Sequence, residues 1–192
     1  MVEMKKAVFL DRDGTLNKDV DYLNSVDGLE LLPTVIEGLR LLQTHGFLLI
    51  IVSNQSGVAR GYFSEEELKK INNRLEEMLL DYKIKITAQY YCPHHSEHGL
   101  GKYKIACKCR KPAIGMIERA VREHFIDLSS SAIVGDKLSD VEMAEEAKIP
   151  LPILVKTGKG MLNVDKVSQI KSIRICDTFL EAAKIIVEKN NE

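Results

Sequence analysis

The sequence predicts an α/β fold: a doubly wound, mainly parallel sheet with helices on both faces. Short apolar runs of strand length alternate along the chain with longer segments whose apolar residues have helical spacing. This alternation implies right-handed crossovers between parallel strands. The 192 residues, 45% hydrophobic and 29% charged, suffice for a sizeable core, and we expect residues 1–192 to form a single domain.

Strands are expected at 5–10, 47–52, 86–91, 132–134, 153–155 and, more weakly, 172–175. Helices are expected at about 34–44, 64–81, 112–125, 141–148 and 177–189. Thr34 is the predicted N-cap of the first helix, and Ser64 with Glu67 forms a capping box for the second. Between the first two strands there is room for one polar loop, 16–33, and one helix. We therefore expect loops, and no separate cap domain, to cover a site.

Polar residues follow the predicted strands. The first strand ends in Asp11-Arg12-Asp13-Gly14-Thr15, the second in Ser53-Asn54-Gln55-Ser56, and the fourth in Gly135-Asp136-Lys137. In open parallel sheets, ligands bind at the carboxyl ends of the strands. One carboxylate there can attack phosphorus while the other moves a proton. Each segment taken alone also fits a simpler interpretation, because Asp, Gly and Ser are common in turns and caps and lysines are mostly surface residues.

A second cluster lies in the loop at about 92–110. Cys92, His94, Cys107 and Cys109 form a C-x-H…C-x-C pattern, and three thiols with one imidazole fit a closed structural zinc site. His95 and the more remote His98 are further candidate ligands, and a loop with incidental thiols is the alternative. Zinc could order a long loop that has few apolar residues.

The net charge and the lengths of the apolar runs limit the kinds of binding partner that we expect. The net charge is −1 and no basic block is present, which argues against nucleic acid as the main partner. No apolar run approaches the length of a membrane span, and the charged N-terminus lacks the features of a signal peptide. We expect a cytoplasmic protein and, because no heptad pattern is visible, a monomer.

The run Asp-x-Asp-Gly-Thr at 11–15, Ser53-Asn54, Lys111, and Gly135-Asp136 with Asp140 resembles the four motifs of the haloacid dehalogenase-like (HAD-like) hydrolases. This resemblance implies a Rossmann-like fold and a role for each residue. Asp11 would be the nucleophile and form an aspartyl-phosphate, and Asp13 would be the acid/base. Mg²⁺ would be held by Asp11, the Asp13 carbonyl and Asp136. Ser53 and Lys111 would stabilise the phosphoryl group. Asp140 would act indirectly, without binding the metal or the phosphoryl group itself.

Further segments, Asn-Gln-Ser-Gly-Val-Ala-Arg-Gly at 54–61, Cys-Pro-His-His at 92–95 and Cys-x-Cys-Arg-Lys-Pro at 107–112, resemble the D-glycero-D-manno-heptose-1,7-bisphosphate 7-phosphatases. The resemblance implies a phosphorylated sugar substrate on the route to lipopolysaccharide precursors. It also implies a set of substrate contacts: Asp19, Tyr22, Asn54, Gln55, Ser56, Arg110 and Lys137. Arg110 is the candidate for the second phosphate, since a guanidinium fork suits phosphate oxygens.

Two alternatives remain open at this level. The histidinol-phosphate phosphatases have a similar nucleophile motif and zinc loop, although they tend to lack the Ser56–Gly61 continuation and Lys137. A non-catalytic, zinc-stabilised binding protein is the alternative from another class. One departure from the heptose family pattern is Val20-Asp21, where a glycine is expected just before Tyr22.

Overall fold

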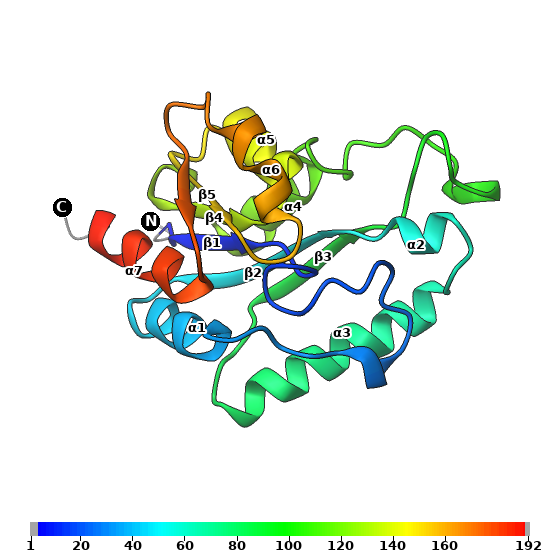
Figure 1. Cartoon of the computed structure of the whole chain (residues 1–192), viewed down its shortest axis with the longest axis horizontal. Coiled ribbons are helices and arrows are strands. Elements are labelled where there is room, and N and C mark those ends of the chain that lie inside the picture. Colours follow the sequence, from blue (N-terminus) through cyan, green and yellow to red (C-terminus); the bar gives the residue numbers. More distant parts are fainter. Residues whose placement is uncertain (1–3, 191–192) are drawn as a thin grey trace.

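The computed structural model, which describes residues 4–190, has a six-stranded parallel sheet at its centre (Figure 1). The strand order is β3-β2-β1-β4-β5-β6, and every pair of neighbouring strands is parallel. The strands are β1 (Ala7–Leu10), β2 (Leu48–Asn54), β3 (Ala88–Cys92), β4 (Ala132–Gly135), β5 (Leu151–Val155) and β6 (Arg174–Cys176). The predicted doubly wound fold is confirmed.

Helices cover both faces of the sheet. Helices α1 (Val35–Thr44), α3 (Glu65–Asp81) and α7 (Phe179–Lys189) pack on one face, and α4 (Gly115–His124), α5 (Leu138–Glu146) and α6 (Gly160–Val167) lie on the other (Figure 1). The alternation within β1 shows how one strand serves two cores. Val8 and Leu10 belong to the first cluster and Ala7 and Phe9 to the second, all four with no exposed surface.

Local sequence accounts for some of the helix ends. The Ser64 hydroxyl accepts a hydrogen bond from the Glu67 amide, and Glu67 in turn accepts one from the Ser64 amide, so the predicted capping box is confirmed. Thr34 occupies the predicted N-cap position of α1, but its side chain does not cap the helix. Its backbone is left-handed, with φ of 68°, and its hydroxyl accepts a hydrogen bond from Leu180 of α7 instead of capping α1.

Three further elements differ from prediction. Helix α4 begins at Gly115, not at Pro112, because Pro112 belongs to a turn that follows a cis Lys111–Pro112 peptide bond. Helix α6 and the short helix α2 (Ser56–Ala59) were not predicted. Helix α2 follows β2, and α6 follows β5 after a short turn. Both helices therefore begin at the carboxyl edge of the sheet.

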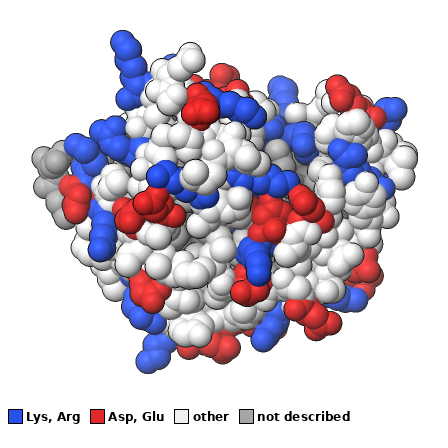
Figure 2. Space-filling view, in the orientation of Figure 1, with Lys and Arg blue, Asp and Glu red and all other residues white. Residues whose placement is uncertain are grey.

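In the described part of the chain, no helix is long and apolar enough to cross a bilayer. Acidic and basic side chains are interspersed over the face shown in Figure 2, in keeping with the net charge of −1. Loops connect β1 to α1 and β3 to α4 at the carboxyl edge of the sheet, where the polar motifs lie.

Candidate active site

The carboxyl ends of β1, β2 and β4 bring the predicted catalytic residues together. These strands are neighbours, so Asp11, Ser53 and Asp136 meet although they are far apart in the sequence. A cavity of about 150 Å³ opens beside them. It is lined by Asp13, Asp19, Asp21, Tyr22, Asn54, Gln55, Ser56, Gly57, Lys137 and Lys159.

Asp11 is a buried carboxylate between two lysines. Its Oδ1 lies 2.8 Å from Nζ of Lys111, and its Oδ2 lies 3.4 Å from Nζ of Lys137. Burial raises the pKa of Asp11, but the charges of Lys111 and Lys137 outweigh burial and hold the pKa well below its ordinary value. Asp11 is therefore ionised near neutral pH, as a nucleophile must be.

The oxygens predicted to hold Mg²⁺ converge on one point. Nζ of Lys137 lies 3.4 Å from Oδ2 of Asp11, 3.1 Å from the carbonyl oxygen of Asp13 and 3.2 Å from Oδ1 of Asp136. Asp136 is completely buried, and its Oδ1 accepts no hydrogen bond. Burial and the charge of Asp11 raise the pKa of Asp136 to about 7. An all-oxygen set with excess negative charge suits a hard divalent cation.

Lys111 is held by carboxylates and by the end of β2. Its ammonium group donates to Asp11, to Oδ1 of Asp140 at 2.6 Å and to the Val52 carbonyl at 2.9 Å. Burial lowers the pKa of Lys111, but the charges of Asp11 and Asp140 raise it by more, so the lysine stays charged. Because the other Asp140 oxygen accepts a hydrogen bond from the Lys137 amide at 3.1 Å, Asp140 positions Lys111 and the start of α5.

Asp13 is bound by a buried arginine that the sequence did not single out. The Arg12 guanidinium donates to both Asp13 oxygens at 2.9–3.1 Å, and its Nη1 donates to Asn72 of α3 at 2.8 Å. Asn17 and Gln55 also donate to Asp13, at 3.0 and 2.9 Å. Burial raises the pKa of Asp13, but Arg12 and Asn17 outweigh it, and the pKa lies below its ordinary value.

The loop after β2 forms a hydrogen-bonded frame. The Gln55 amide nitrogen donates to the Ser53 hydroxyl at 2.7 Å as well as to Asp13. Asn54 binds the backbone of Lys111 twice: it accepts from the amide at 2.9 Å and donates to the carbonyl at 3.1 Å. Asn54 therefore ties β2 to the segment that carries Lys111 while it also lines the cavity.

Most of the remaining predicted substrate contacts line the cavity. Asp19 forms long ion pairs, both 3.8 Å, with Lys137 and Lys159. Tyr22 has a left-handed backbone, with φ of 72°, and its side chain is partly exposed. Ser56 begins α2 and lines the cavity. Arg110 does not line the cavity; its Nη1 donates to the His94 carbonyl at 3.2 Å.

The segment after β5 is a part of the site that sequence reasoning missed. The Lys159 amide donates to Oδ2 of Asp136 at 2.8 Å, and the Thr157 hydroxyl donates to the Gly14 carbonyl at 2.6 Å. Gly14, with φ of 89°, packs so closely on Asp136 that a Cβ would overlap its carboxylate. The run Thr-Gly-Lys-Gly at 157–160, directly after a buried strand, is the signal that could have revealed this segment.

Lys159 also explains the departure at Val20-Asp21. Its ammonium group pairs with Asp21 at 2.7 Å, across the cavity that both residues line. Asp21 is left-handed, with φ of 46°, a conformation that favours glycine. Its amide donates to Oδ1 of Asp19 at 3.1 Å. These two contacts offset the strain of a non-glycine residue there.

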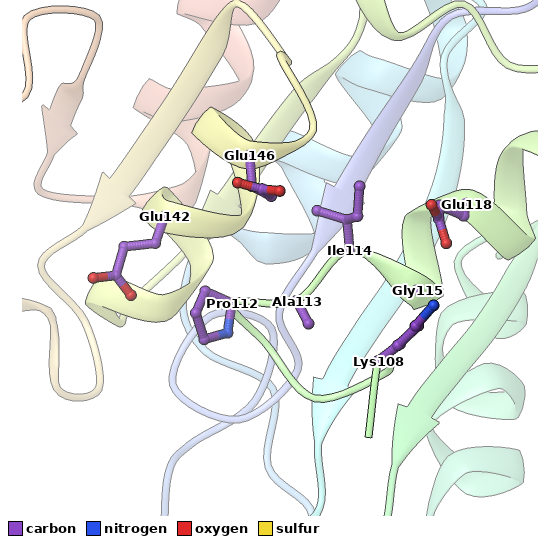
Figure 3. Close-up of a pocket in the computed structure, with 8 residues that line it drawn as sticks. All are labelled: Lys108, Pro112, Ala113, Ile114, Gly115, Glu118, Glu142 and Glu146. Atoms are coloured by element: carbon purple, nitrogen blue, oxygen red, sulfur yellow. The ribbon is translucent and has the colours of Figure 1, made fainter. Parts of the chain in front are cut away.

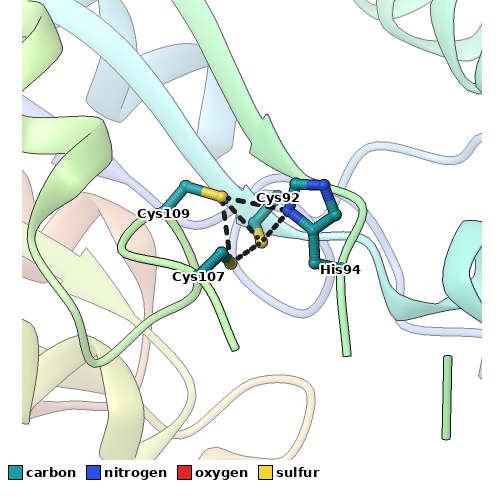
Figure 4. A group of neighbouring side chains, drawn as sticks. All are labelled: Cys92, His94, Cys107 and Cys109. Carbon is teal, nitrogen blue, oxygen red and sulfur yellow. Dashed lines mark hydrogen bonds between the residues drawn. The ribbon is translucent and has the colours of Figure 1, made fainter. Parts of the chain in front are cut away.

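The predicted zinc ligands form a compact group (Figure 4). The three Sγ atoms of Cys92, Cys107 and Cys109 lie 3.0–3.3 Å apart, and Nδ1 of His94 lies 3.4 Å from Cys109 and 3.8 Å from Cys92. His95 lies outside this group, and its Nδ1 accepts hydrogen bonds from the amides of Glu97 and His98. Three thiols and one imidazole nitrogen that face a single point suit zinc.

A second cavity, of about 470 Å³, lies behind the turn at Pro112 (Figure 3). Ile114 and Ala113 form part of its apolar wall, while Glu118, Glu142 and Glu146 project from the neighbouring helices. None of the predicted site residues lines it. Three glutamates with no basic residue except Lys108 would repel a phosphorylated ligand, so the smaller cavity at the strand ends is the candidate active site.

Comparison with known proteins agrees with this geometry. A family model described as HAD-hydrolase-like matches residues 108–182. The chain is 46% identical over 156 residues to a D-glycero-beta-D-manno-heptose-1,7-bisphosphate 7-phosphatase of Haemophilus influenzae, covering 81% of this chain and 84% of the relative. It is 40% identical over 159 residues to the Escherichia coli K12 protein of the same name, covering 83% of each.

Among solved structures, the D,D-heptose 1,7-bisphosphate phosphatase of B. bronchiseptica, complexed with magnesium and phosphate, superposes with a TM-score of 0.84. It is 30% identical, and the match covers 96% of this chain and 99% of that one. A HAD-like phosphatase of Mesorhizobium loti has the same TM-score at 29% identity, covering 97% of this chain and 88% of that one.

Proposed function

The chain belongs to the HAD-like hydrolases, in the family of the D-glycero-beta-D-manno-heptose-1,7-bisphosphate 7-phosphatases, and from this membership we propose that it removes the C7 phosphate of that bisphosphate. The enzyme is a phosphoric monoester hydrolase. The observation that carries the proposal is the convergence of Asp11, the Asp13 carbonyl and Asp136 beside Lys111. Its product would serve ADP- or GDP-heptose and lipopolysaccharide precursor synthesis.

Asp11 is the nucleophile in this proposal. A carboxylate oxygen attacks phosphorus, the bond to the C7 oxygen breaks, and an aspartyl-phosphate forms. Lys111, next to the Asp11 carboxylate, stabilises negative charge on the transferring group, and the Ser53 hydroxyl donates to one of its oxygens. Gln55 holds Ser53 in place through its amide nitrogen.

Asp13 transfers the proton. As acid it protonates the departing C7 oxygen, and as base it takes a proton from the water that hydrolyses the intermediate. Its contacts with Arg12, Asn17 and Gln55 favour the anion, which suits the base step. For the acid step, the carboxyl group has to turn from Arg12 toward the cavity and accept a proton.

Asp11, Asp136 and the Asp13 carbonyl would hold Mg²⁺, which supplies positive charge against the repulsion between an anionic nucleophile and an anionic phosphate. The ammonium group of Lys137 lies among these oxygens. It can serve the substrate phosphate from the cavity that Lys137 lines. The zinc group on the neighbouring loop is structural in this proposal.

Substrate contacts extend outward from the reacting phosphate. Asp19, Tyr22, Asn54 and Ser56 face the sugar from the cavity wall, and Arg110 binds the second phosphate from the zinc loop. We further propose that the enzyme works as a cytoplasmic monomer, with residues 1–192 as one domain and small phosphorylated sugars as its ligands, without nucleic acid or membrane partners.

A substrate panel tests the proposal. It compares kcat/KM, with Mg²⁺ present, for both C1 anomers of the heptose bisphosphate, histidinol phosphate and fructose 1,6-bisphosphate. We expect one heptose bisphosphate anomer to have the highest value. A higher value for histidinol phosphate would transfer the assignment to the histidinol-phosphate phosphatases, and no activity with any of the four would contradict the proposal altogether.

A further inference from the structure

Arg60 is a cation near the cavity with no carboxylate partner in the described part of the chain. It follows α2, the short helix whose first residues, Ser56 and Gly57, line the cavity. Its Nε is buried and donates to no acceptor. The side chain is half-buried, so its charge is only partly hydrated. A guanidinium group in this state is suited to bind an anion that the protein itself does not supply.

The ring of Tyr22 orients this guanidinium. The Arg60 guanidinium carbon lies 5.9 Å from the centroid of Tyr22, and Tyr62 packs against the same tyrosine with its ring edge-on, at 4.8 Å. Tyr22 lines the cavity from a left-handed backbone conformation. Tyr22 and Tyr62 are 42% and 56% exposed, although large aromatic side chains usually bury more of their surface. The group therefore stands at the mouth of the cavity.

The charges around this mouth are unequally matched. The acids Asp19 and Asp21 pair with Lys137 and Lys159, so they are not free to pair with an arginine. The guanidinium of Arg110 donates to a backbone carbonyl, that of His94. Arg60 and Arg110 are therefore two guanidinium groups without acidic partners among the described residues.

The two arginines come from segments that touch. The Leu100 amide of the zinc loop donates to the Ala59 carbonyl, the residue before Arg60, at 2.8 Å, and the two segments lie side by side in Figure 1. Arg110 binds the same loop, since its Nη1 donates to the His94 carbonyl at 3.2 Å.

We propose that Arg60, oriented by the ring of Tyr22, acts with Arg110 as a two-guanidinium site for the second, unhydrolysed phosphate of the substrate. Arg60 is then a specificity-determining residue that separates sugar bisphosphates from sugar monophosphates. The site takes a phosphate dianion at the far end of the sugar from the scissile ester, because both arginines lie outside the group around Asp11. The inference rests on the proposed function, since only a bisphosphate offers a second phosphate.

The test compares the zinc- and Mg²⁺-loaded enzyme with its Arg60→Ala, Arg60→Lys and Arg110→Ala variants. The substrates are the heptose 1,7-bisphosphate and the heptose 7-phosphate, which differ only in the second phosphate. Arg122→Ala is the matched control, because Arg122 is an exposed arginine on α4, away from the cavity. Thermal melting and zinc content show whether each variant is folded.

We expect Arg60→Ala to raise KM for the bisphosphate roughly 10- to 100-fold, the range for a hydrogen bond to a charged group. The loss of kcat/KM with the bisphosphate should exceed the loss with the monophosphate by about tenfold or more. Arg60→Lys should recover part of this difference, since it keeps the charge without the planar fork. Arg122→Ala should leave the ratio of the two substrates unchanged.

Equal losses on both substrates in Arg60→Ala, or no loss, would overturn the inference and leave the proposed function standing. A wild-type enzyme that does not favour the bisphosphate over the monophosphate would overturn the proposed function, and the inference with it. If Arg60→Ala does not fold, Arg60→Gln, which keeps most of the side-chain stem, decides by the same ratio.

Discussion

Buried charges dominate the active site at the scale of single residues. Asp11, Lys111, Asp136 and Asp140 each expose 4% of their surface or less, so each charge depends on its neighbours for stabilisation. Asp11 and Asp140 together raise the pKa of Lys111, and Lys111 helps keep Asp11 ionised. The contacts that keep the proposed nucleophile ionised therefore also keep Lys111 charged.

Replacing the nucleophile tests its role without a change of shape. Asp11→Asn is nearly isosteric, but an amide cannot attack phosphorus usefully. We expect kcat to fall by roughly a thousandfold or more, with the circular dichroism spectrum unchanged. Activity within about tenfold of wild type, or some 1.4 kcal/mol of barrier, would rule out the assignment of Asp11.

Removing Lys111 separates stability from catalysis. Lys111→Met leaves the buried Asp140 carboxylate without its lysine and leaves Asp11 with Lys137 alone, so we expect the free energy of unfolding to fall by about 3–5 kcal/mol and activity to be lost. Adding Asp140→Asn removes one of the stranded charges. The double variant should regain part of the lost stability in denaturant titrations and none of the activity. If the double variant is no more stable than the single one, loss of the ion pair between Lys111 and Asp140 does not explain the lost stability.

The residues that sequence reasoning missed act mainly through other residues. Arg12 binds Asp13 and is itself held by Asn72 of α3, and no local pattern links Arg12 to a residue 60 positions away. Arg12 follows Asp11 in the motif, but only the structure shows that its side chain turns inward and is almost completely buried. The residues of the motifs themselves lie where parallel strands were predicted to end, so Asp11, Ser53 and Asp136 were placed together correctly.

At the scale of elements, the zinc loop extends from β3 toward α4 and carries two cations, Arg110 and Lys111. Cys109 is followed directly by Arg110 and Lys111, and Asn54 holds the Lys111 backbone from the other side. Tyr91 of β3 and Tyr103 of the loop both donate to Glu65 at the start of α3, at 2.8 Å each. The zinc loop, β3 and α3 together thus fix the position of Lys111.

Zinc should therefore affect catalysis without contacting the substrate. In Cys107→Ser or Cys109→Ser we expect zinc content and kcat/KM to fall together, since a misplacement of about 1 Å can cost on the order of a hundredfold in rate. Added Mg²⁺ should not restore the activity. Elemental analysis and kinetics on the same samples measure both quantities.

Asp136→Asn is the matched control for the zinc variants. It should retain zinc and lose Mg²⁺-dependent activity, because it changes the other group of metal-ligand candidates. Zinc-free cysteine variants with full activity would refute the positional role of the zinc loop.

Helix boundaries show where local sequence suffices. The capping box at Ser64 depends on residues three apart and was predicted correctly. Thr34 has a good capping side chain, yet its hydroxyl binds α7, whose position no local pattern reveals. Helix α6 was missed because it begins with Gly160 and exposes Met161 and Leu162, so it lacks a clear apolar face at its start. Pro112 lies in a turn that Asn54 helps to hold, three residues before α4.

At the scale of the whole molecule, the near-neutral net charge hides local groups of like charge. The net charge of −1 conceals a group of acids at the strand ends and two arginines, Arg60 and Arg110, that have no acidic partner among the described residues. Under the proposed function a bisphosphate would match this arrangement, with the reacting phosphate beside Asp11 and Lys111 and the second phosphate at the rim.

The position of the cleaved ester is the most direct test of the account. Phosphorus NMR of heptose 1,7-bisphosphate treated with the enzyme and Mg²⁺ distinguishes the C1 phosphate, the C7 phosphate and free phosphate in one sample. We expect the C7 signal to be replaced by that of inorganic phosphate, while the C1 phosphate persists. Loss of the C1 phosphate with C7 retained, or an unchanged spectrum from a folded, zinc-loaded enzyme, would contradict the account.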